Sequence, residues 1–90
     1  MMPFTHYIIF GEQKTGLTPE ESRKAWSDYE KSLKKLNLKM LGPFGPFGVS
    51  EDTAIILEGT MESFEKYIGS EAMQKCPSLK NRTISLWKEM

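Results

Sequence analysis

The chain has 90 residues, of which 39% are hydrophobic and 27% charged, and its 12 basic and 12 acidic residues cancel. This length and composition predict a single globular domain over residues 1–90 and exclude a disordered tail. The zero net charge argues against a nucleic-acid-binding protein, because neutralising phosphates takes a basic excess. The one cysteine excludes an internal disulfide and suits a reducing compartment.

The N-terminal segment does not have the pattern of a signal peptide. Its apolar run at Tyr7–Phe10 lacks a basic flank and a small-residue cleavage site. The run is also far shorter than the roughly 20 residues that span a bilayer. We therefore expect a cytoplasmic protein without a membrane partner.

The first two predicted elements are a strand and a helix. Phe4–Phe10 is apolar on both alternating faces, which predicts a strand buried on both sides, with His6 on the face that also carries Ile8 and Phe10. A helix is predicted over about 19–36, capped by Thr18 and by Glu21 three residues later. Its apolar residues form one stripe at spacings of three and four: Trp26, Tyr29, Leu33 and Leu36.

The second half of the chain predicts two more strands, a second helix and a last strand. The second helix is expected to turn Met61, Phe64 and Ile68 inward, and Gly69 interrupts it. These elements span Leu38–Leu41 (strand), Thr53–Leu57 (strand), Met61–Ile68 (helix), Ser70–Cys76 (a further helical turn) and Thr83–Lys88 (strand).

The order strand, helix, strand, strand, helix, strand predicts an α+β, ferredoxin-like βαββαβ fold with a four-stranded antiparallel sheet. The first and third strands are the most continuously apolar, so we expect them in the centre and the other two at the edges. Two helices cover one face of such a sheet and leave the other bare. Apolar residues on the bare face predict a homodimer packed sheet to sheet, with a cavity near the join.

Three functions of small α+β domains are excluded by missing residues. RNA-recognition domains stack bases on aromatic residues of the third strand, but "DTAIILEG" has no aromatic, Lys or Arg. Heavy-metal chaperones need paired cysteines after the first strand, and "GEQKTGLTP" has none. A Walker-type lysine pattern is also missing. We therefore expect no nucleic-acid partner, no metal and no cofactor.

The segment "LGPFGPFGVSED", Leu41–Asp52, contains Gly-Pro-Phe twice. It resembles the Asp-Gly-Pro-Phe signature of the YCII-related proteins, with Gly42, Pro43 and Phe44 in the last three places and Leu41 in place of the acid. With the strand order, this makes the chain similar to the dimeric α/β barrel superfamily, which includes the antibiotic-biosynthesis-type monooxygenases. The resemblance implies a barrel dimer whose function ranges from cofactor-free oxygenase or isomerase to no known activity.

Few residues are candidates for chemistry. His6, the only histidine, is interpreted either as a proton acceptor facing the barrel interior or as a structural residue at the rim. Glu58, at the end of the third strand, is a ligand-binding candidate that is interpreted either as a partner of this base or as a solvated residue. If Ile84 and Leu86 pack under the helices, the remaining face of the last strand meets the cavity, which gives the ligand-binding candidates Thr83, Ser85 and Trp87.

Trp87 is equally well interpreted as an anchor of the dimer interface. Phe44 and Phe47 are expected to plug the barrel mouth, to contact the partner subunit or to wall the pocket. Two functions stay open: a dimeric barrel that binds a small organic ligand, and a cofactor-free enzyme, monooxygenase-like or isomerase/lyase-like, with His6 as proton acceptor.

Overall fold

The computed structural model describes residues 4–87, with side chains from His6 to Leu86. The elements follow the predicted order, and the helical turn after the second helix is a short third helix. Their bounds are β1 (Phe4–Gln13), α1 (Pro19–Lys34), β2 (Lys39–Phe44), β3 (Thr53–Thr60), α2 (Met61–Tyr67), α3 (Glu71–Gln74) and β4 (Ser78–Trp87). The last strand therefore begins earlier than the expected Thr83, and Lys88 lies outside the described residues.

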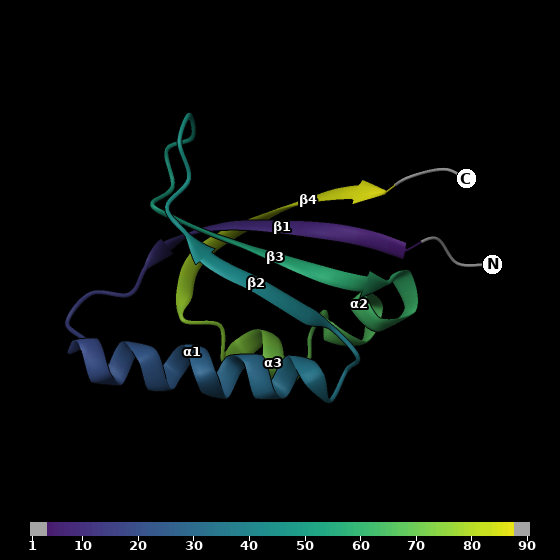
Figure 1. Ribbon diagram of the computed structural model, residues 1–90, viewed down its shortest axis with the longest axis horizontal. Helices are drawn as coiled ribbons and strands as arrows, with labels where there is room; N and C mark the ends of the chain where they lie inside the picture. The colour runs from purple at the N-terminus through teal and green to yellow at the C-terminus, as the bar shows by residue number, and fades with distance from the viewer. Residues whose placement is uncertain (1–3, 88–90) are drawn as a thin grey trace.

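The four strands form one antiparallel sheet in the order β2-β3-β1-β4. This confirms the α+β fold with two central and two edge strands, the arrangement expected of a ferredoxin-like domain. In Figure 1 the described helices all lie on one side of the sheet. The opposite face has no such cover there, and this asymmetry positions the candidate site.

The start of α1 confirms the predicted capping box. The Thr18 hydroxyl accepts a hydrogen bond from the Glu21 backbone N–H at 3.1 Å, and the Glu21 carboxylate accepts one from the Thr18 N–H at 3.0 Å. Two of the backbone donors that a helix start leaves unpaired are thereby satisfied. The predicted stripe then turns inward, with Trp26, Tyr29 and Leu33 buried.

The inward face of α2 differs from the prediction. Met61 and Ile68 are exposed by 42% and 54%, so the expectation that they point inward is wrong. Ser63 and Tyr67 are buried in their place. The cause is the cap: Thr60 accepts a hydrogen bond from the Ser63 N–H at 3.1 Å, which fixes where the helix begins and so which side chains face the sheet.

A buried aromatic cluster joins the helices to the sheet. The rings of Tyr7 and Phe64 stack with centroids 3.7 Å apart, which places Tyr7 under the helices as predicted. The hydroxyls of Tyr29 and Tyr67 are hydrogen-bonded to each other at 2.7 Å. Burial raises the pKa of both phenols, that of Tyr67 to about 12.

These raised pKa values predict a loss of stability in alkali. An unfolded tyrosine ionises near pH 10, whereas the folded pair stays protonated, so the unfolded state gains an advantage above pH 10. We expect the free energy of unfolding to fall by about 2 kcal/mol more between pH 9 and pH 11 in the natural chain than in Tyr29→Phe/Tyr67→Phe. Urea denaturation at both pH values measures this difference, and equal losses in the two proteins would contradict it.

Candidate functional site

The sheet face turned away from the helices, called the open face below, carries three rows of side chains. Along β1, Tyr7 and Ile9 are buried against the helices, and the residues between and beside them point the other way. The strand register aligns the open-face residues across the sheet. The first row is Lys39, Glu58, His6 and Leu86; the second is Leu41, Ile56, Ile8 and Ile84; the third is Ala54, Phe10 and Arg82. Phe44 also pairs with Ala54, after an irregularity in β2 between Leu41 and Phe44.

The first row contains the only histidine of the chain beside a carboxylate. His6 and Glu58 face each other directly on β1 and β3, with His6 Nε2 and Glu58 Oε1 3.6 Å apart. Their side chains are 45% and 20% exposed, so the pair is open to a ligand approaching the face. A histidine beside a carboxylate is an arrangement that general acid–base catalysis can use.

The second row is entirely aliphatic. Leu41, Ile56 and Ile8 are half-buried, and Ile84 at the edge is 40% exposed. In a monomer these side chains meet water on one side, an arrangement that soluble proteins usually cover with a partner or a ligand. The row thus forms an apolar floor between two polar ends.

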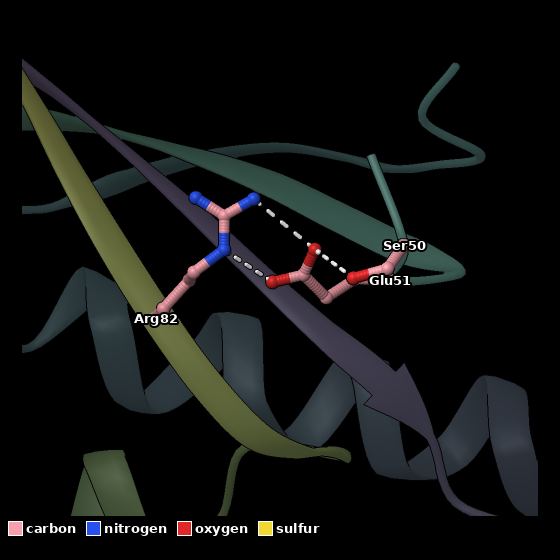
Figure 2. Close-up of polar contacts among 3 residues, drawn as sticks. All are labelled: Ser50, Glu51 and Arg82. Atoms are coloured by element: carbon pink, nitrogen blue, oxygen red, sulfur yellow. Dashed lines mark hydrogen bonds and ion pairs between the residues drawn. The ribbon is translucent and has the colours of Figure 1, made fainter. Parts of the chain in front are cut away.

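The third row ends in an ion pair that links β4 to the loop before β3. Arg82 donates two hydrogen bonds to Glu51, with Nε–Oε2 at 2.5 Å and Nη2–Oε1 at 3.1 Å (Figure 2). The guanidinium also lies 4.7 Å from the centre of the Phe10 ring. The hydrogen bonds from Arg82 lower the pKa of Glu51 and raise the pKa of Arg82. Both charges are therefore held in place on the open face.

The prediction for β4 placed the wrong side of this strand on the open face. The register pairs Ile84 with Ile8 and Leu86 with His6, so these aliphatic residues share the open face. Thr83 and Ser85 pair with Ile9 and Tyr7, which point to the helix side.

The reason is the position of the helices. Since α1 packs mainly on β2 and α2 on β3, little of the helix layer extends over β4. The hydroxyl side of this strand therefore stays in water, and the two aliphatic residues turn to the apolar floor. The backbone of Trp87 pairs with Thr5, and its side chain lies outside the described residues.

The two phenylalanines of the repeated Gly-Pro-Phe segment are separated. Phe44 ends β2, is 49% exposed and lines a shallow hollow with Trp26 and Thr53 on the helix side. Phe47 lies in the loop beyond and is fully exposed. The structure thus brings His6 and Glu58 together and leaves the two phenylalanines apart.

Sequence reasoning missed Arg82 and Glu51. These residues are 31 positions apart and meet only because the loop after β2 passes across the sheet toward β4. No local pattern signals such a contact. The opposite charges of the two residues were visible in the sequence but had many equally plausible partners.

Neither a metal site nor a membrane-spanning helix is found between residues 4 and 87. In that range, no group of three His, Cys, Asp or Glu side chains could hold a metal ion. None of the helices described there has the length and apolar content needed to cross a membrane.

The exposure of His6 allows a structural role to be tested directly. Because nearly half of its side chain is in water, we expect His6→Ala to change the free energy of unfolding by less than about 1 kcal/mol. Glu58→Gln, which keeps the shape of the partner, should behave alike. Thermal or urea unfolding measures both variants, and a loss above about 2 kcal/mol for His6→Ala would show that the residue holds the fold together.

Comparison with known proteins supports the fold. No protein-family model matches the chain, and no curated protein matches it. The chain is similar to the crystal structure of At3g17210 from Arabidopsis thaliana, with a TM-score of 0.65 and 13% identity over 96% of both chains. At this identity the likeness concerns the fold alone, which is the small α+β domain with a four-stranded antiparallel sheet described above.

Proposed function

We propose that the protein is a homodimeric α/β barrel in which two copies pack open face to open face and enclose a site for a small organic ligand. The observation that carries this proposal is the aliphatic second row, Leu41, Ile56, Ile8 and Ile84, on the side of the sheet opposite the helices. Burying such a row against a second copy removes apolar surface from water in both chains. The resemblance of the Gly42–Phe44 segment and of the strand order to dimeric α/β barrels, noted from the sequence, supports the same assembly.

The polar first and third rows suit the ends of the enclosed space. Apolar walls with a few placed polar groups are the usual composition of a ligand site. His6 and Glu58 would then contact the polar part of a ligand, and the aliphatic row its carbon skeleton. Phe10, under the Arg82 guanidinium, supplies an aromatic wall at the other end.

Two neighbouring residues of β3 provide a matched test. Ile56 lies on the open face, whereas Ile55 is 1% exposed in the core. We expect Ile56→Lys to leave a folded monomer, with the dimer weakened at least about 1,000-fold, because a buried unpaired ammonium is costly. Ile55→Lys should abolish folding for the same reason.

Sedimentation equilibrium measures the association of the two variants, and circular dichroism measures whether each of them folds. An Ile56→Lys protein that sediments as the natural chain does, at the same concentration and with the same melting curve, would refute the barrel. A folded Ile55→Lys protein would refute the division of the sheet into a core face and an open face.

A second candidate function is a cofactor-free enzyme of the monooxygenase-like or isomerase/lyase-like kind. The pairing of His6 with Glu58 at 3.6 Å favours it. In that case His6 accepts a proton from an acidic C–H or O–H group of the substrate, and the Glu58 carboxylate stabilises the imidazolium that forms. Thr83 and Ser85 lie on the other side of the sheet and take no part in this proposal.

The contents of the enclosed space distinguish these functions from a purely structural assembly. We expect a crystal structure of the dimer, grown without added ligand, to show a space beside His6 that is open to solvent or holds a small molecule. A dry space filled by the chain's own side chains would contradict both the ligand site and the enzyme, and would leave the dimer as an assembly module.

A further inference from the structure

The loop between β2 and β3 projects from the molecule and exposes an aromatic ring. Residues 45–50, called the arm below, contain Phe47, whose side chain is as exposed as in an extended peptide, at 104%. Pro46 precedes Phe47 and fixes its own φ angle, while Gly45 and Gly48 flank the pair. A fully exposed phenylalanine in a projecting loop is an unusual surface feature that a contact would explain.

The C-terminal end of the arm, where it enters β3, is fastened to the sheet. Glu51 accepts the two hydrogen bonds from Arg82 that tie the loop to β4 (Figure 2). The next residue, Asp52, accepts hydrogen bonds from the Gln13 backbone N–H at 2.7 Å and from the Thr53 hydroxyl at 3.0 Å. These contacts from β1, β3 and β4 fix the direction in which the arm leaves the sheet.

That direction is toward the side of the open face. Arg82 belongs to the third row and lies over Phe10, so its ion pair draws Glu51 across this face. Figure 1 shows the loop between β2 and β3 rising from the sheet on the side opposite the helices. Phe47 is thus held beyond the surface on which the proposed partner would lie.

The size of the open face explains why an arm is useful. Four strands about 4.8 Å apart, with about nine residues of roughly 3.3 Å each, present a face of about 600 Å². Two such faces bury about 1,200 Å² in total, the lower limit for a specific, stable interface. A projecting aromatic side chain from each copy enlarges this area, and a chain of zero net charge does not repel its own copy.

We infer that the arm of each copy is a clasp that packs Phe47 against the other copy of this chain across the paired open faces. This inference rests on the proposed dimer and adds the contact that stabilises it. Burying one phenylalanine side chain changes an association constant by roughly 10- to 100-fold. Two symmetric arms therefore make the dimer at least about 100-fold tighter than the sheet faces alone.

The test compares dissociation constants of the dimer by sedimentation equilibrium. Phe47→Ala should weaken the dimer at least about 100-fold and leave the melting curve of the diluted monomer unchanged, because Phe47 contacts no core. Ile68→Ala is the matched control, since Ile68 is also an exposed apolar residue, at 54%, but adjoins α2 on the helix side. We expect it to change the dissociation constant by less than about threefold.

A photo-reactive benzophenone amino acid at position 47 tests independently whether this position contacts the other copy of the chain. In a mixture of ¹⁴N- and ¹⁵N-labelled chains, irradiation should yield cross-links between one labelled and one unlabelled chain, with the attachment on the open-face strands. Cross-links confined to single chains would overturn the clasp.

The outcomes separate the clasp from the proposed function. A natural chain that stays monomeric overturns the sheet-to-sheet dimer and the clasp together. A natural chain that dimerises as tightly after Phe47→Ala overturns the clasp alone and leaves the dimer standing. Equal weakening by Phe47→Ala and Ile68→Ala also overturns it, because the effect would then not belong to the arm.

Discussion

The uneven covering of the sheet is the constraint on which the rest of the structure depends. A chain of this length supplies enough helix for one layer, and α1, α2 and α3 are all placed on the same side. The core side therefore takes Tyr7, Ile9, Ile55 and Leu57. Because successive side chains of a strand point to opposite faces, the residues next to these four in sequence lie on the open face, whether or not anything covers it.

This alternation explains why the open face is apolar in the middle. Ile8 and Ile56 lie in the two central strands, where the side chains of neighbouring strands on both sides reduce their exposure to water. Polar groups are found at the two ends, in the pairs His6 with Glu58 and Arg82 with Glu51.

The two polar ends differ in what they can do. Arg82 is engaged by two hydrogen bonds to Glu51 and by the Phe10 ring, so it is suited to holding the loop in place. His6 is separated from Glu58 by 3.6 Å and is nearly half exposed, so it is suited to meeting a ligand. One end of the face is thus an anchor and the other is the candidate site.

Much of the fold could be predicted because its signals are local. The capping box at Thr18 and Glu21, the helical stripe through Tyr29 and Leu33, and the apolar runs of β1 and β3 each lie within a few residues. Whether Glu58 partners His6 or is solvated was left open by the sequence, and the antiparallel register of β1 and β3 places the two side chains opposite each other.

The errors concern contacts that no local pattern determines. Which side of β4 faces the helices depends on how far the helix layer extends. The polar and apolar residues from Thr83 to Leu86 alternate, and this pattern alone does not say which of the two sets faces the helices. The ion pair of Arg82 with Glu51 depends on the path of a loop across the sheet. The phase of α2 depends on the position of its Thr60 cap, which sets Ser63 inward in place of Met61.

The central claim is that the open face is covered by a second copy of the chain. Small-angle X-ray scattering of the natural protein at micromolar concentration tests it most directly, because it gives mass and size together. The account predicts twice the 10.3 kDa of one chain and a radius of gyration clearly above the 13.0 Å of the single subunit. A mass of one chain with a radius near that of the subunit would contradict it.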